Sequence, residues 1–423
     1  MSASAAHRAV EAVFRIEQAR LIAGLARMTR DVGLAEELAS DALLLALEKW
    51  PQTGIPDKPG AWLMAAAKRR AVDGFRREKM LERKHAEIGR ELELEQDMAG
   101  FDIEDALDDD VGDDLLRLIF TACHPVLSTE AQVALTLRML GGLSTDEIAR
   151  AFLVAEPTVA QRIVRAKRTL SEAKVEFELP RGEDRAGRLA AVLGVIYLIF
   201  NEGYSATAGQ DLMRPELCDE ALRLGRILAE LAPNEPEVHG LVALMEIQAS
   251  RAPARTRPDG EPVLLADQDR SRWNQLLIRR GLNALQRAEA LGGRRGPYAL
   301  QAAIAACHAR ARTAEETDWG RIAGLYAELA ALTPSPVIEL NRAVAVGMAE
   351  GPGPALAIVD GLAGEPSLKA YYLVPVVRGD LLEKLGRFDE ACEEFERAAA
   401  MTRNERERTV LLGRLEKCRA AMA

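Results

Sequence analysis

The sequence predicts an all-α protein. Alanine and leucine dominate a hydrophobic content of 48%, and aromatic residues make up only 4%. This composition favours helices over sheets, because alanine and leucine are strong helix formers. Beyond residue 180, amphipathic helical segments follow one another, separated by Asn, Gly and Pro turns. A chain of 423 residues is long enough for roughly two to four domains.

Residues 1–80 form the first predicted helical unit. Within it, residues 34–48 have an apolar stripe on one side and an acidic face on the other. The stripe consists of Leu34, Leu38, Ala42 and Leu45, and the acidic face of Glu37, Asp41 and Glu48, with Leu44 among them. A leucine inside an acidic face suits docking to a basic partner. A solvated face with one stray leucine is the alternative.

A basic helix follows the turn-rich stretch 50–60. Its two clusters, residues 68–70 and 76–77, are about seven residues apart in the sequence and therefore lie on one side of the helix. Trp62 and Phe75 are interleaved with them and would offer stacking surfaces to unpaired bases. The alternative is that both aromatic side chains belong to the core.

Residues 81–112 are predicted to be a flexible, self-repelling acidic linker. Between Glu82 and Asp114 there are 14 acidic and 3 basic residues, a net charge of −11. The formal charge of the whole chain is −10, so the rest of the chain is close to neutral. The acidic total therefore does not exclude a nucleic-acid partner.

Residues 113–179 contain a predicted helix-turn-helix. Ser144 can cap its first helix, and Glu147, three residues later, completes a capping box. Pro157 fits the first turn of the second helix, where a missing N–H costs nothing. Leu153 occupies the turn position that often carries Gly.

The second helix of this motif has an apolar back and a Gln/Arg front. The back consists of Val159, Ile163, Ala166 and Leu170; the front of Thr158, Gln161, Arg165 and Arg168, with Arg162 and Lys167 on the flanks. Side-chain amides and guanidinium groups of this kind pair with base edges in the major groove, and further cations meet phosphates. The alternative is an amphipathic surface helix with solvated arginines.

Residues 180–423 are predicted to form an all-helical, repeat-like extension. Gly386, Phe388, Ala391, Phe395 and Ala398 have the small/large spacing of a tetratricopeptide hairpin. The segment 341–359 is similar to a degenerate copy, with Ala355 standing 36 residues before Ala391. Tandem hairpins of this kind form a concave face that could bind a protein or peptide.

No enzyme, metal, cofactor or membrane signature is found in the sequence. It has no Gly-rich phosphate loop, no HExxH and no GxSxG. Its five cysteines are scattered without CxxC spacing, which indicates a reducing cytoplasm and no metal site. The longest apolar run, Leu189 to Phe200, is too short to span a bilayer and is interpreted as a buried helix.

The first two units resemble bacterial sigma factors of the extracytoplasmic function (ECF) group. The segment 35–41 stands where that family docks on the clamp helices of core RNA polymerase, which implies polymerase contacts by Glu36, Glu37, Asp41 and Leu44. The helix that begins at 61–63 is similar to the family's promoter-melting helix. This implies −10 contacts by Trp62, Lys68, Arg69, Arg70, Asp73, Arg76 and Arg77.

The helix-turn-helix is similar to the reader of the −35 element, which implies contacts by Thr158, Gln161, Arg162, Arg165, Lys167 and Arg168. The runs 118–125, 198–206 and 267–273 are similar to the subgroup with a long tetratricopeptide-like C-terminal extension. Ser40 stands where the family often has Gln, and Arg69 where many members have Asn.

The expected function is that of a cytoplasmic sigma factor, which binds core RNA polymerase and promoter DNA and is modulated by its C-terminal extension. One alternative is a stand-alone helix-turn-helix regulator whose repeat domain senses a ligand or peptide. That alternative leaves the segments 34–48 and 61–77 unused. A second alternative, a repeat scaffold with no DNA role, accounts for the last 240 residues or so.

Overall fold

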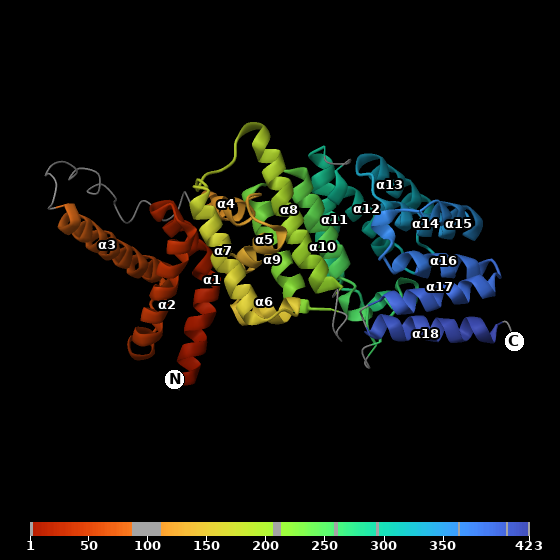
Figure 1. Cartoon of the computed structure of the whole chain (residues 1–423), viewed down its shortest axis with the longest axis horizontal. Coiled ribbons are helices and arrows are strands. Elements are labelled where there is room, and N and C mark those ends of the chain that lie inside the picture. The colour runs from red at the N-terminus through yellow and green to blue at the C-terminus, as the bar shows by residue number, and fades with distance from the viewer. Residues whose placement is uncertain are drawn as a thin grey trace. The chain divides into compact units, whose positions relative to one another are not determined.

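The computed structural model of the chain is built from α-helices, and the predicted all-α class is confirmed (Figure 1). It describes residues 3–86, 111–205, 213–257, 261–292, 296–362, 364–402 and 405–421. No β-strand occurs in these ranges, apart from an isolated bridge between Thr256 and Pro262. Contacts between residues divide the chain into two compact units, Met1–Val195 and Ile196–Ala423.

The first unit begins with three long helices and continues with four shorter ones, and the unit boundary falls within the eighth helix. These helices are α1 (Ala3–Thr29), α2 (Val32–Thr53), α3 (Pro59–Ala86), α4 (Val111–Ala122), α5 (Thr129–Met139), α6 (Thr145–Phe152), α7 (Glu156–Glu172) and α8 (Gly182–Tyr204). Most of the predicted linker, residues 87–110, lies outside the described residues.

The second unit consists of ten further helices in the described ranges, with four short 3-10 turns between some of them. The helices are α9 (Pro215–Leu231), α10 (Pro236–Ala249), α11 (Gln275–Ala290), α12 (Pro297–Arg310), α13 (Trp319–Leu332), α14 (Pro336–Ala349), α15 (Pro352–Gly361), α16 (Leu373–Lys384), α17 (Phe388–Met401) and α18 (Glu405–Ala420).

Small side chains let α2 approach its neighbours closely. Its most buried residues include Ala35, Ala39, Ala42 and Ala46, which are at most 1% exposed, and the helix contacts both α1 and α3. Leu38 and Ala42 of the predicted apolar stripe are buried, whereas Leu34 and Leu45 are only half-buried. The buried surface of α2 is therefore rotated from the predicted stripe, because the alanines face two packed helices.

The core of α4–α7 is formed by large aliphatic side chains. Leu118, Leu135, Leu137 and Met139 have no measurable exposure. Gln132 closes the α4–α5 turn, because its side-chain amide donates hydrogen bonds to the carbonyl oxygens of residues 123 and 124, at 3.1 and 3.0 Å. These hydrogen bonds fix the turn and the start of α5, and α5 in turn packs against the helix-turn-helix.

Helix α8 contains the apolar run predicted to be buried. Leu193, Ile196 and Phe200 are at most 3% exposed, which confirms burial for these side chains, whereas Leu198 is 44% exposed. Among the described helices, its stretch Asp184–Tyr204 is the one that is long and apolar enough to cross a membrane, by length and composition alone. Core helices of water-exposed proteins also satisfy that criterion.

Two arginines connect the C-terminal segments 198–206 and 267–273, as far as these are described. The guanidinium of Arg255 lies 3.8 Å from the ring centroid of Tyr204, and that of Arg251 lies 5.7 Å from the centroid of Trp273. Arg251 also donates to Gln268 at 3.3 Å. Cation–π contacts of this kind stabilise buried guanidinium groups that lack a carboxylate.

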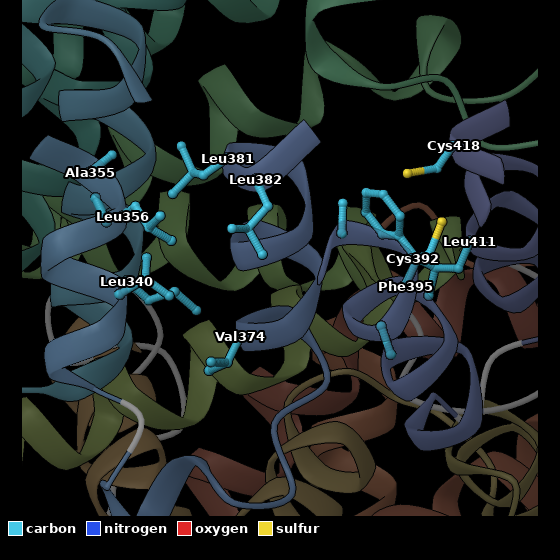
Figure 2. Packing of buried hydrophobic residues seen from close by; sticks show 14 of the residues in the cluster. Leu340, Ala355, Leu356, Val374, Leu381, Leu382, Cys392, Phe395, Leu411 and Cys418 are labelled. Carbon is cyan, nitrogen blue, oxygen red and sulfur yellow. The ribbon is translucent and has the colours of Figure 1, made fainter. Parts of the chain in front are cut away.

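Successive helices from α13 to α18 contact one another in sequence order (Figure 1). Their shared core contains Leu340, Leu381, Phe395 and Cys418 among others, contributed by α14, α16, α17 and α18 (Figure 2). Ala355 and Ala391, the alanines 36 residues apart, are both fully buried and each is the fourth residue of its helix. The equivalent placement follows from similar packing of two consecutive helical pairs.

Gly379 allows α16 to approach α17. A Cβ atom at this position would lie 2.8 Å from the Cε1 atom of Phe395, which is fully buried. We expect Gly379→Ala to lower the free energy of unfolding by about 1–3 kcal/mol, because the Phe395 ring cannot move without disturbing the core. Urea unfolding followed by circular dichroism measures the change.

Gly413→Ala is the matched control for this substitution. Gly413 lies in helix α18, and a Cβ atom there would meet no atom within 4 Å. Alanine at this position should leave the protein equally stable, or stabilise it by up to about 1 kcal/mol through helix propensity. Equal effects of the two substitutions would contradict the packing described for α16 and α17.

Candidate nucleic-acid interface

A complete capping box begins the helix-turn-helix. The Ser144 hydroxyl accepts a hydrogen bond from the Glu147 N–H at 3.1 Å, and the Glu147 carboxylate accepts one from the Ser144 N–H at 2.8 Å. The predicted box is therefore confirmed. Glu147 is also paired with Arg15 of α1 at 2.8 Å. Burial raises the pKa of Glu147, but the Ser144 N–H and the Arg15 guanidinium lower it by more, so the net pKa is below its ordinary value.

The turn between α6 and α7 uses a left-handed residue. Leu153 has φ 51° and ψ 42°, the conformation for which glycine is usual. A leucine there costs roughly 1–2 kcal/mol of backbone strain. Pro157 stands in the first turn of α7, as predicted. The turn therefore has the geometry expected of the motif despite the absence of glycine.

Helix α7 buries the predicted apolar back. Val159, Ile163, Ala166 and Leu170 are at most 5% exposed, and α7 contacts α5 and α6. The four residues of the front are all exposed; we call them the reading face, and they are Thr158, Gln161, Arg165 and Arg168. The guanidinium of Arg168 is paired with Glu172 at 2.6 Å on the same helix.

Lys167 faces α2 rather than open solvent. Its ammonium group is paired with the carboxylate of Glu36 on α2. The guanidinium of Arg138 on α5 donates to the other oxygen of the same carboxylate at 2.6 Å. Glu36 is only 4% exposed, so one buried carboxylate connects three helices.

The two cations keep Glu36 ionised. Burial alone raises the pKa of this carboxyl group, but Lys167 and Arg138 lower it by more, and the net pKa is below its ordinary value of 4.5. Breaking a buried pair leaves an unpaired charge and is strongly destabilising. A polymerase contact through Glu36, or a DNA contact through Lys167, would therefore require this pair to open.

Further contacts join the same two groups of helices. The amide of Gln18 on α1 donates to the carbonyl oxygen of Arg138 at 3.2 Å, and Arg27 is paired with Asp114 of α4 at 3.4 Å. Arg138 in turn donates to the carbonyl oxygen of Leu143 at 3.3 Å, directly before the capping box. Helices α1–α3 and α4–α7 thus form one packed unit.

Four of the seven predicted −10 residues line a groove between α2 and α3. Its volume is about 440 Å³, and its lining includes Leu44, Trp62, Arg69, Arg70 and Asp73. The ring of Trp62 packs edge-on against that of Trp50, with the centroids 5.2 Å apart. Trp62 is therefore half-buried at the wall of the groove. One part of its ring packs in the core, as in the first interpretation, and another part stays accessible for stacking, as in the second.

The predicted polymerase-binding residues on α2 have different surroundings. Glu37 is exposed and Leu44 is 57% exposed, whereas Asp41 is paired with Arg70 of α3 at 3.2 Å. That pair is itself largely exposed and therefore contributes little stability. The groove thus brings predicted polymerase-binding and DNA-binding residues together.

The other basic residues of α3 differ in exposure, and their contacts with DNA stay a prediction. Arg69 and Arg76 are exposed and Lys68 is half-buried, and none of them forms an ion pair within the described part of the chain. Phe75 is 38% exposed. Arg77 lies in α3, but its side chain is outside the described residues. The described residues contain no group of side chains that could hold a metal ion.

Arg138 is a structurally important residue that the sequence reasoning missed. Its guanidinium organises the Glu36 contact and the start of the helix-turn-helix. Nothing in the local pattern around residue 138 indicates a partner about a hundred residues earlier. Glu36 lies outside the predicted apolar stripe of α2, so that pattern gave no signal of a buried carboxylate there either.

Three protein families match parts of the chain. Sigma-70 region 2 matches residues 13–80, and sigma-70 region 4 matches residues 117–170. Together these two regions indicate a sigma factor of the sigma-70 family. Sigma-70 regions 2 and 4 support promoter recognition, imply binding to core RNA polymerase and promoter DNA, and indicate a transcription factor rather than an enzyme.

The C-terminal part of this sigma factor is matched by a family of unknown function (DUF6596), over residues 188–289. An uncharacterized protein of Rhizobium meliloti (strain 1021) is 46% identical to the chain over 401 residues, which cover 94% of this chain and 93% of that protein. No solved structure shows significant similarity to the chain.

We expect Glu36→Gln to lower the free energy of unfolding by about 2 kcal/mol at pH 7, because two cations then face a neutral amide. The pKa of Glu36 is lowered in the folded state, so its stabilising contribution is present above pH 4.5 and is lost as the pH falls through the lower folded value. Urea unfolding at a series of pH values measures both effects.

Glu37→Gln is the control, since Glu37 is the exposed neighbour of Glu36 on α2. It should change the stability of the protein by no more than about 0.5 kcal/mol. Glu36→Gln should also remove part of the acid dependence seen for the natural chain. The same pH dependence in both variants would show that the Glu36 pair does not stabilise the unit.

Proposed function

We propose that this sigma factor belongs to the ECF group. In this proposal, α2 binds core RNA polymerase, α3 opens and recognises the −10 element, and α7 reads the −35 element. The observation that carries the proposal is the reading face of α7: four polar or cationic side chains are exposed on a helix whose opposite side is buried. Such a helix can enter a major groove without loss of its core.

The two DNA contacts would act together. Each helix offers few base contacts, and a tether between them raises the effective concentration of the second contact once the first has formed. The acidic linker 81–112 would be repelled by promoter phosphates, which keeps this tether from binding DNA in place of the helices. The proposed site of action is the cytoplasm.

We further propose that the C-terminal part is tetratricopeptide-like and modulates the activity of the DNA-binding helices. Its support is the equivalent placement of Ala355 and Ala391 in consecutive helical pairs. A concave face formed by such hairpins suits a protein or peptide partner. A fragment of residues 1–180 that transcribed with the rate and selectivity of the full chain would contradict modulation.

In vitro transcription tests the main proposal. The full-length chain is added to purified core RNA polymerase and a library of promoter fragments, and the transcripts are sequenced. Specific initiation that depends on the added chain supports a sigma factor. The alternative, a stand-alone helix-turn-helix regulator with a sensing repeat domain, would bind DNA but would not associate with core enzyme.

We expect Arg165→Ala and Gln161→Ala each to weaken promoter binding by about 1–3 kcal/mol and to relax the base preference at one position, because a base-edge contact is lost. Arg162, on the flank of α7 and half-buried, should act on phosphate. Arg162→Ala should therefore weaken binding to all sequences and reduce the slope of log K against log salt by about 1. Fluorescence anisotropy with the holoenzyme measures both quantities.

For the polymerase contact, we expect Glu37→Lys combined with Asp41→Lys to abolish co-purification with core enzyme, and Leu44→Ala to weaken it by a comparable amount. The matched control is Glu216→Lys with Asp219→Lys, which reverses two exposed charges on α9. Undiminished co-purification of the α2 variant would contradict a role for this helix in polymerase binding.

A further inference from the structure

Val164 is an exposed apolar residue on the solvent side of α7. Its exposed fraction is 63%, the second highest among the large hydrophobic residues that the structure describes as exposed. The core side of α7 is already filled by Val159 and Ile163 among others, each at most 5% exposed. Packing among the residues that the structure describes therefore does not explain the position of Val164.

The helical period places Val164 on the same side of α7 as the reading face. It follows Gln161 by three residues and precedes Arg168 by four, and residues at these spacings are neighbours on a helix surface. Gln161 and Arg168 are exposed and lie opposite the buried side of α7. Gln161 and Arg168 therefore mark the middle of the exposed side. Val164 lies on one side of them and Arg165 on the other, so one half of this surface is apolar and the other half is cationic.

An exposed valine in a helix is unfavourable without a partner. Its branched side chain restricts χ1 and gives it a lower helix propensity than alanine, and it gains little from burial in this chain. The apolar group that B-DNA presents in the major groove is the C5-methyl group of thymine. A valine held between an amide and a guanidinium would contact that methyl group when the neighbouring polar side chains pair with base edges.

We propose that Val164 is a specificity-determining residue that contacts the C5-methyl group of a thymine in the upstream promoter element. The proposal rests on the proposed function of α7. In this proposal, the exposed side of α7 recognises DNA in two ways. Gln161 and the arginines form hydrogen bonds with bases, and Val164 makes an apolar contact. Burying one methyl group in such a contact changes affinity about threefold to fivefold.

Uracil substitution tests this contact, because uracil differs from thymine only by the missing methyl group. The preferred site is first selected from random DNA with the full-length chain bound to core polymerase. Each thymine of that site is then replaced by uracil, one at a time, and affinity is measured for the natural chain and for Val164→Ala. We expect one thymine at which uracil weakens binding by the natural chain threefold to fivefold.

For Val164→Ala, thymine and uracil at that position should bind equally, while all other positions respond as in the natural chain. Val164→Thr, which retains one of the two methyl groups, should show an intermediate difference. Val126→Ala is the matched control: Val126 is 42% exposed in the α4–α5 turn, which is not part of α7, and its loss should leave the methyl dependence unchanged. Circular dichroism verifies that all variants fold.

The outcomes separate this inference from the proposed function. Selective binding that is insensitive to every uracil substitution overturns the thymine contact alone. So does a methyl effect that persists in Val164→Ala. Equal weakening by Val164→Ala on all DNA, together with weaker binding to core polymerase, would assign Val164 to a protein contact instead. A chain that selects no sequence would overturn the proposed function, and the inference with it.

Discussion

The buried carboxylate of Glu36 is the interaction on which the arrangement of the first unit depends. It lies on α2 and is paired with Arg138 of α5 and Lys167 of α7, so three helices from two sequence segments meet at one anion. Desolvating a carboxylate costs several kcal/mol unless partners compensate for it. Both cations therefore stabilise the ionised carboxylate, and displacement of α5 or α7 would remove one of its two partners.

The pair of Glu36 and Lys167 occupies one residue from each of the two interfaces expected of a sigma factor. Glu36 is adjacent to exposed Glu37 on the helix expected to meet polymerase, and Lys167 is adjacent to exposed Arg168 on the helix expected to meet DNA. In the free chain, the expected polymerase-binding residue Glu36 and the expected DNA-binding residue Lys167 are therefore paired with each other. Separating α2 from α7 would require new partners for both charges, because an unpaired buried charge is strongly destabilising.

Local patterns predicted the helix-turn-helix well, because its determinants lie within a few residues of one another. The capping box of Ser144 and the buried face that includes Ile163 follow from spacing along a single helix. The contact between Glu36 and Lys167 joins residues far apart in the sequence, and no periodicity encodes it. The buried side of α2 was also misplaced, since large residues such as Leu45 were weighted over the alanines that make close packing possible.

Val164 shows a different reason for an incomplete prediction. Its spacing from Gln161 and Arg168 was visible in the sequence, but an apolar residue in an amphipathic helix is usually assigned to the core. Only its exposure separates it from Val159. A helix that reads DNA needs both kinds of side chain outward, because the base edges present hydrogen-bonding groups and thymine adds a methyl group. Polarity alone therefore identifies which side of α7 is solvent-facing, but it misses the apolar part of the surface available for recognition.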